Sequence, residues 1–249
     1  ALIVGDFSNG NDGIVLKGKT ALSDLKGQQV NLVELSVSHY LLARSLDSIG
    51  AAEKDLTVIN TSDADMVAAW ASDDVTSVVT WNPLLSEILA TPDSHKVFDS
   101  SQIPGEIIDM MVVNTGTLKA NPALGKALTG AWYEIMAVMS GDDDAAIAAR
   151  TQMATASGTD LAGYDAQLAT TRMFFKAADA VAFVRSDDLP KTMENVAGFS
   201  FDHGLLGEGA PDAGFIGIGF PGGKSIGDTG NLKLRFDDSY MAMAADGKL

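Results

Sequence analysis

The chain has 249 residues, of which 46% are hydrophobic and 20% are charged, a composition that suits a globular protein with a substantial core. Its formal net charge is −16, which argues against nucleic acid and anionic membrane surfaces as partners, because both would repel it. The sequence contains no cysteine, so disulfides and thiol catalysis are excluded. We expect a soluble monomer without a cofactor or metal, since the three histidines are not spaced as a helical metal pair.

The first segments read as short strands separated by turns. Residues 1–4 are apolar and predict a strand, and residues 5–13 are dense in glycine, asparagine and aspartate, which favour a loop. Residues 14–16 predict a second short strand, and residues 22–27 a helical turn that ends at a glycine. The sequence does not start with a basic and apolar leader, so we expect that a signal peptide is not part of this chain, and no apolar run is long enough to cross a bilayer.

The clearest pattern is an alternation of strands and helices between residues 29 and 82. Strands are predicted at residues 30–35, 56–59 and 75–80. Helices are predicted at residues 38–48 and 63–71, and Pro83 suits the first turn of a third helix. This βαβαβ order indicates an α/β fold with a parallel sheet and right-handed crossovers.

The rest of the chain is predicted to be mainly helical. A strand is expected at residues 107–114, and helices at residues 122–140, 143–155, 160–169, 171–184, 190–195 and 237–245. A glycine-rich loop with one short strand at residues 215–218 occupies residues 204–230. The acidic run at residues 142–144 is interpreted as a helix cap rather than a calcium site, because it lacks spaced ligands.

Polar residues follow the three predicted strands of the βαβαβ segment. Because parallel strands end at one edge of a sheet, and ligands of open α/β sheets bind there, we expect these residues to form a site. The candidate ligand-binding residues are Glu34, Ser36, Ser38, His39, Trp81 and Asn82. Together they offer hydroxyls, an amide, a carboxylate and an indole, which suits a small polar ligand.

Four of these candidates also have a structural alternative. Ser36 or Ser38 could simply cap the following helix, whose free N–H groups would otherwise attract an anion or a carbonyl oxygen. Trp81 could be a core residue, although its place before Asn82 favours a cleft position. Glu34 could point into solvent. Trp70 and Trp132 lie in apolar helical patterns and are interpreted as packing residues.

The sequence carries no convincing catalytic motif. There is no nucleophile-elbow pattern, and a serine nucleophile would need a base held by a third group. The glycines at residues 217–222 and the segment 222–225 lack the helix that nucleotide-binding glycine motifs require. We therefore expect a protein that is not an enzyme.

Several short motifs, and their order along the chain, resemble those of a known family. Residues 23–30 (SDLKGQQV), 36–42 (SVSHYLL) and 80–83 (TWNP) resemble the second lobe of periplasmic binding proteins of the nitrate/sulfonate/taurine (NitT/TauT) type of ABC transporter. Residues 201–206 (FDHGLL) and 234–237 (LRFD), followed by Tyr240 and Met241, resemble the binding proteins associated with urea carboxylase operons.

This resemblance implies a type II periplasmic-binding-protein fold, with two lobes, a hinge and a ligand cleft between the lobes. It divides the chain into residues 1–18 (hinge and lobe 1 remnant), 19–106 (lobe 2) and 107–249 (return hinge strand and the mainly helical part of lobe 1). Residues 14–16 and 107–114 would be the two hinge strands, and the first lobe would be incomplete at its N-terminus. Ser36, Ser38, His39 and Trp81 match the ligand-facing segments of the family, and Asp109 lies on the return strand.

The resemblance implies the solute-binding component of an ABC importer, outside the cytoplasm, with a membrane permease as its partner. Acids rather than basic residues lie near the candidate site, among them Asp6, Asp12, Glu34 and Asp109. Carboxylates suit N–H donors, so we expect a small planar nitrogen-rich solute such as urea or guanidine. Binding of nitrate, taurine or an alkanesulfonate is the alternative. A thiamine-pyrimidine enzyme of the same fold and a plain interaction module are alternatives of other classes.

Overall fold

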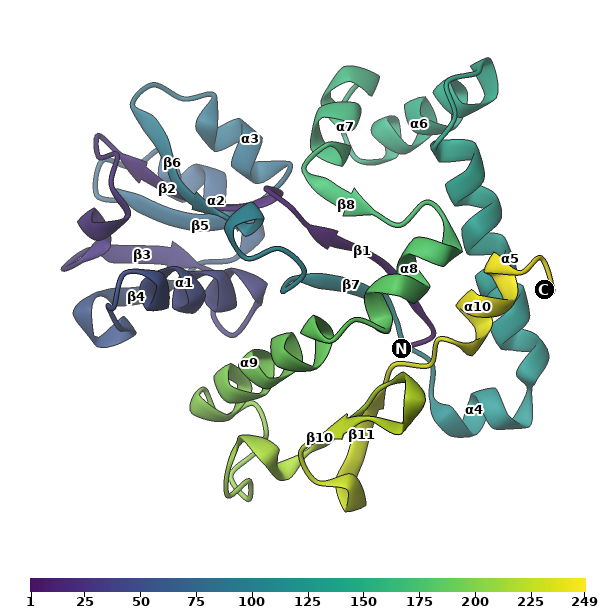
Figure 1. The fold of residues 1–249 in the computed structure, drawn as a ribbon. Helices are drawn as coiled ribbons and strands as arrows, with labels where there is room; N and C mark the ends of the chain where they lie inside the picture. Colours follow the sequence, from purple (N-terminus) through teal and green to yellow (C-terminus); the bar gives the residue numbers. More distant parts are fainter. The chain divides into compact units, whose positions relative to one another are not determined.

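The computed structural model describes all residues 1–249 and divides into two compact units (Figure 1). Unit 1 comprises Ala1–Phe7 and Ile108–Leu249, and unit 2 comprises Ser8–Ile107. The chain therefore leaves unit 1 after the first strand and returns to it by the strand that begins at Ile108. No helix combines the length and the apolar character that a bilayer span requires.

Unit 2 is built on one five-stranded sheet with the order β4-β3-β5-β2-β6. Its strands are β2 (Asp12–Lys17), β3 (Gln29–Leu32), β4 (Thr57–Asn60), β5 (Ser77–Trp81) and β6 (Ser94–Asp99). β3 pairs in parallel with β4 and β5, as the sequence predicted, whereas β2 is antiparallel to both β5 and β6. The sheet is therefore mixed, with its parallel half formed by the βαβαβ segment.

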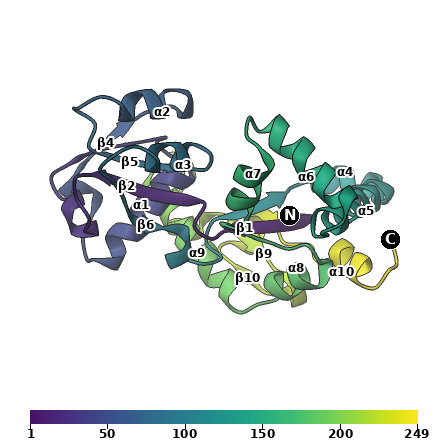
Figure 2. The ribbon, with the colours of Figure 1, turned by 90° about the horizontal axis from the view of Figure 1, so that it is seen from above.

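Helices cover both faces of this sheet. They are α1 (Val37–Ser48), α2 (Asp63–Trp70) and α3 (Leu84–Leu89). Figures 1 and 2 place α1 and α2 on opposite faces. Val15 and Val78 pack against the buried side chains of α2 and α3, including Met66, Trp70 and Leu85. The apolar side chains whose spacing predicted these helices are thus the ones that pack against the sheet.

The position of β2 corrects one expectation. Residues 14–16 were expected to form a hinge strand, but Ile14 and Leu16 are fully buried between β5 and β6 inside the sheet of unit 2. Unit 2 accordingly begins at Ser8 rather than at residue 19. The apolar triplet could not distinguish a connecting strand from a central one, because both are buried and equally short.

Unit 1 contains two three-stranded sheets and most of the helices. One sheet has the order β7-β1-β8, from β1 (Ile3–Ser8), β7 (Ile108–Met111) and β8 (Thr171–Met173). The other has the order β10-β9-β11, from β9 (Gly217–Gly219), β10 (Ser225–Ile226) and β11 (Leu232–Arg235). The helices are α4 (Thr115–Ala120), α5 (Pro122–Met139), α6 (Asp144–Ala156), α7 (Leu161–Leu168), α8 (Ala177–Val184), α9 (Asp188–Asp202) and α10 (Ser239–Ala245).

Most predicted helices of unit 1 are present, but one prediction was wrong. Residues 171–184 were expected to form one helix, whereas Thr171–Met173 is strand β8 and the helix begins only at Ala177. The Phe174 N–H donates to the Gly5 carbonyl of β1, so pairing with a distant strand replaces the local helical preference. The acidic run caps as predicted, since the Asp143 carboxylate accepts the Ala146 N–H at the start of α6.

Candidate functional site

The carboxyl ends of β3, β4 and β5 form one polar edge of unit 2. β3 pairs in parallel with both neighbours, and Asn31 lies opposite Val78. Two amide side chains join the strand ends. The Asn31 Nδ2 donates to Thr61 Oγ1 at 2.9 Å, and the Glu34 backbone N–H donates to Asn60 Oδ1 at 3.0 Å. The polar segments that follow the three strands therefore lie along one edge, as the sequence predicted.

Helix α1 begins at this edge with two serines in different roles. Ser36 is the N-cap: its hydroxyl accepts the Ser38 N–H at 3.1 Å and donates to the Val33 carbonyl at 2.6 Å. The Ser38 side chain is fully buried, and its hydroxyl has no hydrogen-bond partner. Leaving a buried hydroxyl unpaired costs about 1–3 kcal/mol, so the first turn of α1 contains a polar group whose hydrogen-bonding requirement the chain does not meet.

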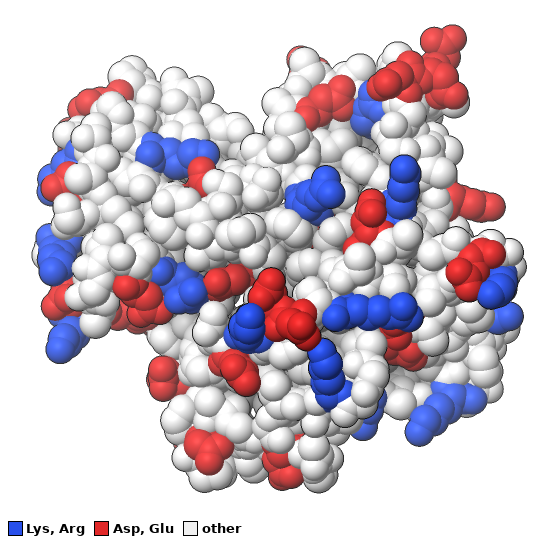
Figure 3. All heavy atoms as spheres, in the orientation of Figure 1, with Lys and Arg blue, Asp and Glu red and all other residues white.

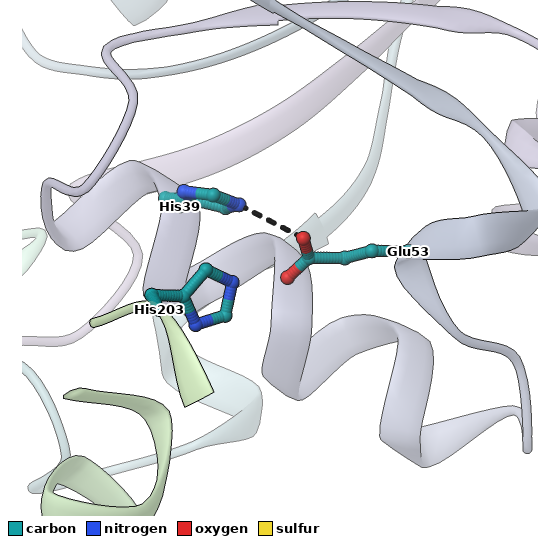
Figure 4. A group of neighbouring side chains, drawn as sticks. All are labelled: His39, Glu53 and His203. Atoms are coloured by element: carbon teal, nitrogen blue, oxygen red, sulfur yellow. Dashed lines mark hydrogen bonds and ion pairs between the residues drawn. The ribbon is translucent and has the colours of Figure 1, made fainter. Parts of the chain in front are cut away.

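His39 is held from both ring nitrogens inside unit 2. Its Nδ1 accepts the N–H of Leu35, a residue at φ 62°, over 3.1 Å. The proton therefore resides on Nε2, which faces Glu53 Oε2 at 3.1 Å (Figure 4). The ring thus fixes the left-handed turn that leads into α1, and neither Ser36 nor Ser38 bonds to it. This geometry positions the helix start and does not assemble a serine nucleophile with its base.

Asp12 lies on the same edge of the sheet, buried at the start of β2 with 3% exposure. A chain of hydroxyls orients its carboxylate. The Ser100 hydroxyl accepts the Gly10 N–H at 2.8 Å and bonds to the Ser8 hydroxyl at 2.6 Å, and Ser8 donates to Asp12 Oδ2 at 2.5 Å. Sequence reasoning included Asp12 among the candidates but missed the two serines. Ser100 is distant in sequence, and Ser8 lies in a segment that was predicted only as a loop.

The sheet register places Asp12 beside Trp81. The two residues are direct cross-strand partners in the antiparallel β2–β5 pair, so their side chains share a face. Ile14 and Val79 follow on that face, opposite to Val15 and the α2–α3 layer. It is the face covered by α1, which begins two strands away. In the strand order, β3, after which α1 begins, is the direct neighbour of the Trp81 strand β5 and lies two strands from the Asp12 strand β2.

The remaining candidate residues do not join this group of side chains. The Asn82 Oδ1 accepts both the N–H and the hydroxyl of Ser86, so this side chain closes the first turn of α3. Glu34 is exposed and its carboxylate has no hydrogen bond. Asp109 belongs to unit 1, where it lies on β7 opposite Asp6 of β1. The edge of unit 2 therefore joins Asp12, Trp81 and the α1 start.

Two basic side chains of unit 2, Arg44 and Lys96, are held by acidic partners. Arg44 of α1 donates from Nε and Nη2 to the two carboxylate oxygens of Glu106, at 2.7 and 3.0 Å. Tyr40 donates to the same carboxylate, and Lys96 pairs with Asp99. On the molecular face drawn in Figure 3, acidic and basic side chains lie interspersed. The polar edge thus offers N–H donors and a carboxylate rather than a basic pocket.

Comparisons with known proteins bear on the fold. No family model and no curated protein matches the sequence. Among solved structures, the chain is similar to the alkanesulfonate-binding protein SsuA of Xanthomonas axonopodis pv. citri bound to MOPS, with a TM-score of 0.64, 17% identity and coverage of 83% of this chain and 70% of that chain.

Two further structures give the same picture. The periplasmic aliphatic sulphonate binding protein SsuA of Escherichia coli has a TM-score of 0.67 at 18% identity, over 82% of this chain and 68% of that one. The periplasmic sulfonate-binding protein SsuA of Methylobacillus flagellatus KT has a TM-score of 0.68 at 13% identity, over 98% and 68%. At these identities the likeness concerns the fold, and the chain has the α/β fold of periplasmic binding proteins.

Proposed function

We propose that this chain is the solute-binding component of an ABC-type importer and that it captures a small, planar, nitrogen-rich solute such as urea. In this role it works outside the cytoplasm and delivers the solute to a membrane permease. The fold shared with periplasmic sulfonate-binding proteins supports the general role. The motifs that resemble binding proteins of urea carboxylase operons support the nitrogen-rich class.

The observation that carries the proposal is the unpaired, fully buried hydroxyl of Ser38 at the start of α1. A helix start offers N–H donors and a positive potential, so a ligand oxygen is favoured there. Asp12 and Trp81 share the sheet face that α1 covers. A carbonyl oxygen bound at the helix start would leave the N–H groups of the same ligand for the Asp12 carboxylate. The flat indole of Trp81 suits a planar ligand.

An alkanesulfonate is the second candidate, because its oxygens also suit a helix start and the similar structures include sulfonate-binding proteins. Its full negative charge would lie near the buried carboxylate of Asp12, and Arg44 is already held by Glu106. Like charges at short range disfavour binding. Urea carries no charge and brings the N–H donors that a carboxylate requires, so the geometry favours it.

Calorimetric titration of the protein with urea, nitrate, taurine and an alkanesulfonate tests the proposal. We expect heat with urea that is lost, or at least about tenfold weaker, in Ser38→Ala, as a lost hydrogen bond to a buried group predicts. Ser45→Ala is the matched control: this serine is also fully buried on α1, but its hydroxyl donates to the Leu42 carbonyl. Binding of taurine or nitrate without urea would refute the solute class. Unchanged affinity in Ser38→Ala would refute the site.

A further inference from the structure

Leu35, the residue before the N-cap of α1, has a backbone conformation that its own side chain disfavours. Its φ angle is 62°, in the left-handed region, where a Cβ comes too close to the following carbonyl oxygen. A leucine populates this region roughly tenfold less than the right-handed one. The side chain of Leu35 is 47% exposed, so burial of apolar surface does little to hold the turn. Another interaction must therefore stabilise it.

The imidazole of His39 supplies that interaction. Its Nδ1 accepts the Leu35 N–H at 3.1 Å, and the ring is buried, so water competes little for this hydrogen bond. On the other side of the ring, Nε2 faces Glu53 Oε2 at 3.1 Å. A carboxylate at this position favours the tautomer with the proton on Nε2, which leaves Nδ1 as an acceptor. The ring thus acts on the backbone of Leu35 and is itself oriented by Glu53.

The turn at Leu35 determines how the polar groups of the α1 start are presented. Val37 is the first residue of the helix, and its backbone N–H has no hydrogen-bond partner. The hydroxyl of the next residue, Ser38, is buried and also unpaired. Both donors follow Leu35 within three positions. A different φ angle at Leu35 would rotate the chain that enters α1 and would change the direction of both groups.

We infer that Leu35 and His39 are positioning residues of the solute site: His39 holds Leu35 in the left-handed turn, and the turn sets the donors of Val37 and Ser38 for an oxygen of the solute. His39 acts through Leu35, a role other than the ligand contact expected from the sequence. Without the Nδ1 acceptor, the competent turn is populated roughly tenfold less, and the apparent affinity falls by the same factor. The inference rests on the proposed solute-binding role of this edge.

Two substitutions of His39 test this role. In His39→Asn the amide oxygen takes the place of Nδ1 and accepts the Leu35 N–H, whereas in His39→Gln the amide lies at the place of Nε2. Calorimetric titration uses whichever of urea, nitrate, taurine and an alkanesulfonate binds the wild-type protein. We expect about tenfold weaker binding in His39→Gln and binding within about threefold of wild type in His39→Asn. Amide hydrogen exchange at Leu35, which requires no solute, should be at least about tenfold faster in His39→Gln and little changed in His39→Asn.

A second substitution at the turn gives the rescue test. Glycine adopts a positive φ readily, so adding Leu35→Gly to His39→Gln should restore the affinity to within about threefold of wild type. Ile49→Gly is the matched control. Ile49 is also an exposed apolar residue that flanks α1, but its φ angle is −113°, so its replacement should not restore binding. Circular dichroism checks the folding of each variant.

The outcomes separate this inference from the proposed function. Normal binding by His39→Gln, or equal losses in His39→Asn and His39→Gln that Leu35→Gly does not relieve, would overturn the inference and leave the proposed function standing. If His39→Gln does not fold by itself, failure of Leu35→Gly to restore folding and binding has the same meaning. The absence of heat with all four solutes in the wild-type protein would overturn both.

Discussion

Replacing Asp6 by asparagine is expected to stabilise the protein at pH 8 and to have much less effect at pH 4.5. The substitution keeps the shape of the side chain and a hydrogen bond to Asp109 while removing a buried charge. The pKa of Asp6 is about 7 in the folded protein and about 3.8 in its ordinary surroundings. At about 1.36 kcal/mol per pKa unit, the full cost of ionising Asp6 in the folded state approaches about 4 kcal/mol.

The direction follows from proton linkage. Because the folded-state pKa is raised, the folded protein holds a proton that the unfolded chain releases. This stabilising contribution is complete below pH 3.8 and is lost as the pH rises through about 7. Asp109 is exposed and lets solvent screen the pair, so we expect a gain of about 2 kcal/mol for Asp6→Asn at pH 8.

Thermal unfolding of the two proteins, followed by circular dichroism at both pH values, measures this difference. A gain of about 2 kcal/mol corresponds to a rise in Tm of about 4–8 °C for a chain of this size. At pH 4.5 the two Tm values should differ by no more than about 2 °C. Glu134→Gln is the control for loss of an exposed charge. A lower Tm for Asp6→Asn at pH 8, or the same difference at both pH values, would refute the reasoning.

Two further substitutions test packing and charge. Gly5→Ala should destabilise the protein by about 1–3 kcal/mol, because its Cβ would overlap the indole of Trp132, whereas Gly209→Ala, with no atom nearby, should be close to neutral in the same thermal assay. Glu106→Gln should cost about 2–3 kcal/mol in urea unfolding, because it breaks the two-oxygen pair with the arginine of α1. Asp47→Asn removes the exposed partner of the same arginine and should cost less than about 0.5 kcal/mol; an equal cost for both would contradict the burial argument.

Local sequence patterns were sufficient for the elements that carry strong periodicity. Helices α1, α2 and α5 and the three parallel strands of unit 2 lie where the sequence predicted them, within a few residues. Strand β6 was missed because it is an edge strand with one buried residue, Phe98, and reads as polar. Strand β11 was missed because it lies next to a glycine-rich stretch and is only four residues long.

For the candidate site, the sequence predicted the position of the residues but not their individual roles. Parallel strands must end at one edge, so the sequence by itself brought Ser36, Ser38 and the segment after β5 to a common position. Their individual roles depend on contacts that no local pattern contains. Ser36 caps α1 and Asn82 closes the first turn of α3, whereas the Ser38 hydroxyl stays unpaired. The ring of His39 holds the turn before α1.

The sequence by itself determined the βαβαβ core of unit 2 and its polar edge, because 3.6- and 2-residue periods and parallel strand ends are local properties. Only the tertiary structure decided which distant strands pair. The antiparallel position of β2 sets Asp12 beside Trp81, and the bulge at Gly5 sets Asp6 against Asp109. Pairing between strands far apart in the chain depends on the register and packing of the whole sheet, so the acid pair is a product of the fold.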